Sequence, residues 1–267
     1  MLILAIGDIH GNDFPELKEL VESMSVDAVF CTGDLCDVDI LRRFIFSNPV
    51  LASLGFTLAD LIGAEEYRKI IMHSIESQNR IIKRFGSLNC PVFLVYGNND
   101  YLDDDIRSYN KRHNLKIESL QDKVKHYKNI KLLCGELVKF KELDIIGVSG
   151  YISPSALDKK KQDEFYKHLE SLFKMAKNPV IFLTHEPPEN ILDRVRLEIS
   201  SAYNMNIGNP VYNRIIKNFS PVLHLCGHIH EARGRILYKG THVVNLGTID
   251  QGYELIEIKG SNVKFLE

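Results

Sequence analysis

Seven side chains able to ligate a metal ion follow strand-like apolar runs in this chain. Each run stops at Gly or Thr and then delivers one or two of them: Asp8, His10, Asp34, Asn98, His185, His228 and His230. Buried parallel strands read as continuous apolar runs, and sites in open α/β sheets form beyond the carboxyl ends of such strands. The sequence therefore predicts one metal centre shared by five strand ends.

The spacing and type of these residues narrow the chemistry. Asp8 and His10 are two positions apart, as are His228 and His230. Alternate residues at a strand end point to one side, so each pair is expected to face one ion. A mixture of carboxylate, amide and imidazole ligands favours Mn, Fe, Zn or Ni over Mg or Ca. Glycines that permit tight turns precede four of the ligands: Gly7, Gly33, Gly97 and Gly227.

Composition excludes several classes of protein. The 267 residues, of which 45% are hydrophobic, suit a globular chain with a sizeable core. The net charge of −2 gives no basic field for nucleic acid. No apolar run reaches the roughly 18 residues that a membrane helix needs. We therefore expect no membrane association.

The N-terminus and the cysteines point to the cytoplasm. A first strand beginning at Leu2 leaves no room for a signal peptide before Asp8. The cysteines are odd in number, which favours buried, reduced thiols over a disulfide framework: Cys31, Cys36, Cys90, Cys134 and Cys226.

The elements that must position the ligands alternate in type. Strand-like runs at 2–7, 27–32 and 91–96 are separated by helical patterns, which is typical of parallel βαβ units. Residues 38–86 exceed one crossover, and their helical spacing predicts a two-helix insertion. It either packs on the sheet or forms a wall or lid over the site, and packing is favoured for most of its residues.

The second half of the chain predicts a further sheet. Runs at 130–134, 136–140 and 143–148 read as antiparallel strands. A long loop at 186–210 follows His185, and loops of this length near a site are often functional. The remaining expected elements are helices at 159–177 and 211–219 and strands at 179–184, 221–226, 233–239, 241–246, 252–258 and 262–266. We expect a single domain over 1–267.

Five motifs resemble, in order, those of the calcineurin-like metallophosphoesterases. They are "GDIHG", "GDLCD", "GNND", "THEPP" and "GHIH", matching D-x-H, G-D-x-x-D, G-N-H-D/E, a lone His and G-H-x-H. The resemblance extends from Met1 to about residue 250 and is strongest to the small prokaryotic branch related to cyclic-nucleotide phosphodiesterases. It implies a four-layer αββα sandwich of mixed α/β class.

The resemblance also implies how two divalent metal ions are shared. Asp8, His10 and His230 would hold one ion, and Asn98, His185 and His228 the other, with Asp34 bridging both. Two-metal sites place their ions about 3.5–4 Å apart and activate a bridging hydroxide for in-line attack on a phosphoester. No covalent enzyme intermediate is needed.

Three further positions carry catalytic predictions. Asn99 stands where the family has a His that assists the leaving oxygen, and an amide cannot deliver a proton near neutral pH. Asp37 and Asp100 complete their motifs and would orient ligating groups, or else cap the helices that follow. Many phosphatases of the family have an Arg after the second Asp of G-D-x-x-D, where this chain has Val38, so no such clamp is expected.

These observations favour a dinuclear-metal phosphoesterase, with phosphodiesterase activity ahead of monoesterase activity because of Asn99. The expected substrate is a small phosphoester such as a nucleotide, and a homo-oligomer is compatible with the sequence. A metal-dependent nuclease is an alternative that the charge disfavours. A non-catalytic scaffold on the same fold is another, disfavoured because every ligand position holds a suitable side chain.

Overall fold

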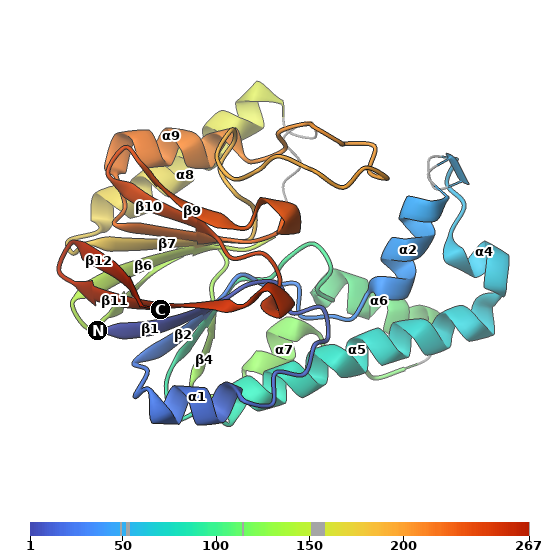
Figure 1. The fold of residues 1–267 in the computed structure, drawn as a ribbon. Coiled ribbons are helices and arrows are strands. Elements are labelled where there is room, and N and C mark those ends of the chain that lie inside the picture. The colour runs from blue at the N-terminus through green and yellow to red at the C-terminus, as the bar shows by residue number, and fades with distance from the viewer. Residues whose placement is uncertain (49, 52–53, 114, 151–157, 267) are drawn as a thin grey trace.

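Two six-stranded mixed sheets face each other at the centre of the molecule, and helices cover their outer faces (Figure 1). A computed structural model describes residues 1–48, 50–51, 54–113, 115–150 and 158–266. The predicted four-layer αββα sandwich is confirmed.

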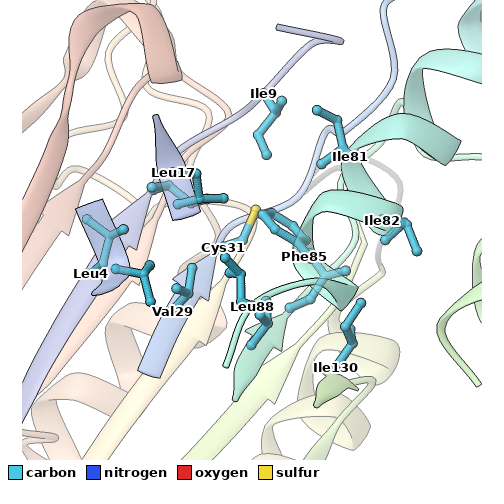
Figure 2. Packing of buried hydrophobic residues seen from close by; sticks show 14 of the residues in the cluster. Leu4, Ile9, Leu17, Val29, Cys31, Ile81, Ile82, Phe85, Leu88 and Ile130 are labelled. Carbon is cyan, nitrogen blue, oxygen red and sulfur yellow. The ribbon is translucent and has the colours of Figure 1, made fainter. Parts of the chain in front are cut away.

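The first sheet has the order β12-β11-β1-β2-β3-β4. Its parallel half consists of β1 (Leu2–Ile6), β2 (Ala28–Cys31), β3 (Val92–Leu94) and β4 (Ile130–Leu132), and its antiparallel half of β11 (Tyr253–Lys259) and β12 (Asn262–Leu266). Helices α1 (Leu17–Ser23), α5 (Ala64–Gly86) and α7 (Leu120–Val124) contribute buried side chains to its outer face. Figure 2 shows this packing, with Leu17 and Phe85 lying against Leu4, Val29 and Cys31.

The second sheet has the order β5-β6-β7-β8-β10-β9. It consists of β5 (Glu136–Phe140), β6 (Leu143–Val148), β7 (Val180–Thr184), β8 (Leu223–Cys226), β10 (Thr241–Asn245) and β9 (Gly234–Tyr238). Strands β6, β7, β8 and β10 are parallel, and both edge strands are antiparallel. Helices α8 (Lys159–Met175) and α9 (Pro210–Phe219) cover its outer face, where Phe182 of the sheet meets Phe173 and Tyr212.

Strand β2 shows why its sequence is apolar throughout. All four of its residues are buried. Ala28 and Phe30 face the core between the two sheets, whereas Val29 and Cys31 face the helices. A strand in a central layer has no solvent-facing side, so the alternation of side chains leaves no polar position.

One predicted pairing is wrong. Strands β5 and β6 are antiparallel as expected, but β4 belongs to the first sheet, where it runs parallel to β3. The chain changes sheets between Leu132 and Glu136, and the apolar pattern of a strand carries no information about which neighbour it joins. Cys134 lies in this crossover and is exposed, which also corrects the expectation that all five cysteines are buried.

The predicted insertion contains α2 (Asp39–Ser47) and α5, together with a short helix, α4 (Leu58–Ile62), that the sequence analysis did not predict. Residues 49 and 52–53 of the insertion lie outside the described residues. The C-terminal half of α5 packs on the sheet through Ile81 and Phe85. Its N-terminal half extends beyond the sheet and packs instead near α6 (Asp103–His113), so that α2 and α4 stand away from the sandwich (Figure 1).

Backbone pairing within the 186–210 loop joins its first half to its second half. Isolated bridges join Pro188 to Asn209 and Arg194 to Asn206. Two short 3-10 turns are also present among the described residues, η2 (His230–Ala232) and η3 (Ile249–Gln251). No described helix combines the length and apolar character needed to cross a membrane.

Candidate metal centre

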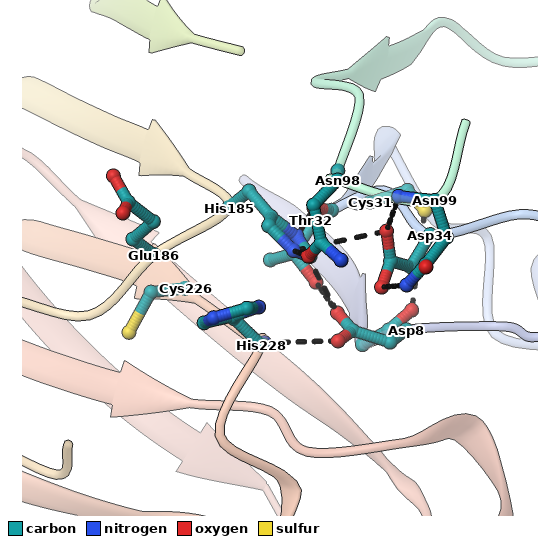
Figure 3. A network of polar contacts seen from close by, with 12 residues as sticks. Asp8, Cys31, Thr32, Asp34, Asn98, Asn99, His185, Glu186, Cys226 and His228 are labelled. Carbon is teal, nitrogen blue, oxygen red and sulfur yellow. Dashed lines mark hydrogen bonds and ion pairs between the residues drawn. The ribbon is translucent and has the colours of Figure 1, made fainter. Parts of the chain in front are cut away.

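The seven predicted ligands come together at one edge of the sandwich, beyond the carboxyl ends of β1, β2, β3, β7 and β8. Parallel strands of both sheets end there, so loops from the two layers meet (Figure 3). Two sets of side chains have ligand atoms within 4.8 Å of one another: Asp8 with His10 and His230, and Asp8 with Asp34 and His185. These sets are the geometric basis for a metal centre.

The ligand atoms of the first set, Asp8, His10 and His230, lie close to one another. The Nε2 atoms of His10 and His230 are 3.2 Å apart, and His230 Nε2 lies 3.1 Å from Asp8 Oδ2. Asp8 is fully buried and also accepts hydrogen bonds from the Thr32 hydroxyl at 3.0 Å and from the His228 backbone N–H at 2.9 Å. These bonds hold the carboxylate in place without involving the imidazoles.

The second set centres on Asp34, which has one oxygen toward each half of the site. Its Oδ2 lies 3.7 Å from His10 Nε2, and its Oδ1 lies 3.7 Å from His185 Nε2. His185 Nε2 is 3.0 Å from Asn98 Oδ1, and its ring stacks edge-on against His228 with centroids 4.9 Å apart. Asp34 therefore occupies the intermediate position that a bridging ligand requires.

The backbone brings the ligands together by turns rather than by strand alternation, which corrects the reason given for the Asp8–His10 pair. His10, Asp34 and His228 have φ angles of 46°, 48° and 67°. Such left-handed conformations are uncommon for residues other than Gly, cost of order 1–3 kcal/mol each, and cluster at functional sites. Left-handed backbone at three of the predicted ligands indicates that the site constrains the conformation of these loops.

The glycines before the predicted ligands are needed mainly because other side chains lie close to their Cα atoms, and less because the backbone turns there. Of the four, Gly33 alone has a positive φ. A Cβ on Gly97 would overlap Asp34 Oδ1 and come within 2.6 Å of His185 Cε1, and a Cβ on Gly227 would overlap Asp8 Oδ1. The ligands thus pack directly on the neighbouring backbone, which only glycine allows.

Burial and mutual charge shift the titration of the site. Burial favours neutral Asp8, but His185 and a hydrogen bond from His230 outweigh it and hold the pKa of Asp8 well below its usual range. Burial likewise disfavours charged His185, yet Asp34 and Asp8 raise its pKa above 6.5. Burial and the nearby His185 lower the pKa of His228 to about 3. The cluster is thus a buried ion-pair network whose members control one another's protonation.

The hydrogen bonds of His185 test whether a metal fits. Its Nδ1–H donates to the Thr32 carbonyl at 2.8 Å, so Nε2 of the neutral ring has only a lone pair to offer. That lone pair faces Asn98 Oδ1 and Asp34 Oδ1, which are both acceptors. A cation between these three atoms satisfies all of them, so the donor set fits a divalent metal ion.

Asp100 acts on the loops and not on the ligand atoms. Its Oδ1 accepts the Leu35 N–H at 2.8 Å and Gln78 Nε2 at 3.2 Å, and its Oδ2 accepts the Gly97 N–H at 2.9 Å. It thereby ties the loop after β2 to the loop after β3. Burial and the neighbouring Asp34 raise the pKa of Asp100 to about 6.

Asp37 lies with the insertion. Its backbone N–H donates to Ser77 of α5, and its carboxylate contacts His73 of the same helix at 3.1 Å and the Asp39 N–H at 3.2 Å. The structure therefore brings Asp37 to α5 and the start of α2.

Asn99 contacts the bridging carboxylate. Its backbone N–H donates to Asp34 Oδ1 at 2.9 Å and its side-chain amide to Asp34 Oδ2 at 2.6 Å. It also lines a cavity of about 240 Å³ over the centre. The amide is placed where it can both hold Asp34 and face a ligand.

Sequence reasoning missed several residues of the site. Thr32 holds Asp8 and His185 at once, through its hydroxyl and its carbonyl. Asn245 holds the turn after β10 by accepting the Gly247 N–H and donating to the carbonyls of Leu192 and Ile229. Arg42 of α2 lines the cavity, although the sequence analysis expected no arginine there. No local pattern in the sequence signalled this position, because it depends on where α2 lies in the fold.

Replacing Gly97 by alanine should disrupt the centre from within. The added methyl group would displace Asp34 and His185, and disturbances of ligand support typically cost about 10–100-fold in metal affinity. Metal content after dialysis, measured beside circular dichroism, tests this. Gly234→Ala is the matched control, because its added Cβ would meet nothing nearer than Leu192 Cδ2 at 3.5 Å. Wild-type metal affinity in a folded Gly97→Ala protein would contradict the assigned packing.

The affinity for metal should increase as the pH rises through the pKa of His185, which lies above its ordinary value. Below that pKa the His185 ring carries a proton on Nε2, and a metal ion must displace it to bind. Above that pKa the proton no longer competes with the metal ion for Nε2. Each displaced proton weakens binding by about tenfold per pH unit on the acid side. Titration calorimetry with Mn²⁺ between about pH 6 and pH 9 measures the slope. His185→Gln should flatten it, and an unchanged slope in that variant would assign the proton elsewhere.

Comparison with known proteins agrees with this geometry. The sequence profile of the family described as Calcineurin-like phosphoesterase matches residues 1–232. No functionally curated protein matches the chain. One solved structure is 19% identical with a TM-score of 0.70, covering 100% of this chain and 98% of the other. The protein TT1561 of Thermus thermophilus is 15% identical with a TM-score of 0.56, at the same coverage.

At such identities the structural matches show the fold alone. An archaeal phosphodiesterase is 13% identical with a TM-score of 0.41, over 100% of this chain and 99% of that one, which is too distant to carry an argument about substrate. The profile match spans most of the chain and includes all seven predicted ligands. The chain therefore belongs to the calcineurin-like phosphoesterase family.

Proposed function

We propose that the protein hydrolyses small phosphoesters with two divalent metal ions and prefers diesters to monoesters. The observation that carries this proposal is the convergence of two carboxylates, four imidazoles and an amide beneath one cavity. Membership of the phosphoesterase family supports the reaction class. When bound, the metal ions supply positive charge for the phosphoryl oxygens and lower the pKa of a water molecule.

The protein's own contribution is to hold the ligands before substrate arrives. Asp34 is fixed by two hydrogen bonds from Asn99, and Asp8 by Thr32 and the His228 backbone. Asp100 ties the loops that carry Asp34 and Asn98. Preorganised charges of this kind need no rearrangement as the transition state forms.

The preference for diesters rests on the groups that line the cavity. Among its described lining residues, the only titratable side chains outside the ligand set are Arg42 and Glu231. One oxygen of Glu231 already accepts the N–H groups of Arg196 and Leu197. With Asn99 in place of a histidine, the described lining has no imidazole outside the predicted ligand set that could protonate the leaving oxygen. Substrates with good leaving groups should therefore react best.

The remaining proposals follow from the ligand set and the thiols. Mn, Fe, Zn or Ni suit the mixed donors better than Mg or Ca. All five cysteines are free, in keeping with a reducing compartment, and we propose a cytoplasmic location and a single domain. No contact of the described residues specifically favours the nuclease or the scaffold reading.

The function is tested with a panel of phosphomonoesters, diesters and nucleotides assayed with each metal in turn. Asp34→Asn keeps the shape of the side chain but removes the charge between the two halves of the site, so metal content and turnover should both fall by about 10–100-fold. Asp39→Asn, which alters an exposed carboxylate on α2, is the control. Undiminished metal content and turnover in Asp34→Asn would refute the proposed centre.

Replacing Asn99 by histidine should restore a general acid. The kcat/KM for a simple alkyl monoester should rise more than that for a nitrophenyl diester, because protonation of a poor leaving group is worth about 10²–10⁴-fold. Asn99→Gln is the control, because it enlarges the side chain without adding an acid. It should raise kcat/KM for neither substrate. Assays at matched metal occupancy measure both substrates. A wild-type protein that already prefers alkyl monoesters would show that Asn99 does not set the preference.

A further inference from the structure

The cavity over the metal centre has two walls that come from outside the sandwich. Helix α2 contributes Arg42, Ile45 and Phe46. The 186–210 loop contributes an opposing set, which is Val195, Leu197, Ser200 and Ile207. The ligands and Asn99 form the floor between them, and the two segments project on the same side of the molecule in Figure 1.

Arg42 reaches this cavity from the first part of α2. Val38 precedes the helix and is buried, and its carbonyl accepts the N–H of Arg42 at 2.9 Å. Residues four apart lie one above the other on a helix. Arg42 therefore lies one turn into α2, on the segment that follows the loop carrying Asp34.

The charge of Arg42 is available to a ligand. Among the described residues it forms no ion pair, and its guanidinium lies 5.9 Å from the centre of the Phe46 ring. It is half-buried and is the only Lys or Arg among the described residues that line the cavity. A guanidinium beside a phosphoester site matches phosphoryl oxygens with two parallel N–H donors.

The walls around this charge are apolar. Ile45 and Phe46 of α2 line the cavity together with Val195, Leu197 and Ile207 of the loop, and Ser200 and Glu231 are the polar residues of the lining outside the floor and Arg42. Small-molecule sites combine an apolar lining with a few polar groups that fix orientation. A metal floor, one cation and two apolar walls therefore suit a ligand that has a phosphoryl group and an apolar body.

We infer that Arg42 binds a phosphoryl oxygen of the substrate and that the α2 and loop walls receive an apolar or aromatic group esterified to the same phosphate. This inference rests on the proposed function and names the substrate class of that site. It assigns to the insertion the role of a cavity wall through α2, while α5 packs on the sheet.

The experiment compares Arg42→Ala and Arg42→Lys with the control Arg43→Ala. Arg43 is the next residue on the same helix, is exposed, and does not line the cavity. Binding of inorganic phosphate to the metal-loaded protein is measured by calorimetry, and KM and kcat are measured with a phenyl diester. Arg42→Ala should weaken phosphate binding and raise KM by about 10–100-fold, since a charge-assisted hydrogen bond contributes about 1.5–3 kcal/mol. Arg42→Lys should recover part of the loss, and Arg43→Ala should change neither quantity.

A second variant tests the apolar wall. Phe46→Ala should reduce the preference for a phenyl ester over the matching methyl ester, whereas Phe56→Ala, which removes an exposed ring outside the cavity, should not. Unchanged phosphate affinity in folded, metal-loaded Arg42→Ala would overturn the role of Arg42. An unchanged phenyl-to-methyl ratio in Phe46→Ala would overturn the substrate class. A wild-type protein that hydrolyses no phosphoester would instead refute the proposed function, and the phosphate-binding measurement would still decide the role of Arg42.

Discussion

The structure depends on keeping two carboxylates, Asp8 and Asp34, out of water at the junction of two sheets. Their exposures are 0% and 2%. A buried charge is costly unless it is paired and hydrogen-bonded, and each carboxylate has both kinds of partner. The histidines provide the pairing, while Thr32 and Asn99 provide hydrogen bonds that do not depend on protonation. The same network that makes burial tolerable also presents the oxygens to a metal.

This constraint explains the form of the loops around the centre. Three ligands have left-handed backbone, and glycines stand where any side chain would strike a carboxylate or an imidazole. Loops in such conformations persist only when their surroundings hold them. Here a buried strand holds the start of each loop, and Asp100 ties two loops to each other. The large core is what allows a strained, charged edge to be kept.

The sandwich and the insertion contribute different parts of the candidate site. The sandwich supplies the residues of the candidate metal centre. The α2 helix and the 186–210 loop supply the walls of the cavity, and Ile191 of the loop packs against Cys226 and Val243 of the second sheet. Helix α5 links the two parts, since its buried polar residues Ser77 and Gln78 contact Asp37 and Asp100 while its apolar residues pack on the first sheet.

Much of the fold, and the meeting of the seven predicted ligands at one edge of the sandwich, could be predicted from the sequence, because both leave local patterns. Fully apolar runs such as Ala28–Cys31 identify central strands, and each ligand follows such a run within a few residues. The sequence did not determine that β4 leaves the second sheet for the first, since strand pairing depends on contacts between distant segments. Nor did it reveal that positive φ angles, rather than strand alternation, aim His10 and His228. Only the tertiary structure placed Arg42 over the centre, because that position depends on where α2 lies and not on its local sequence.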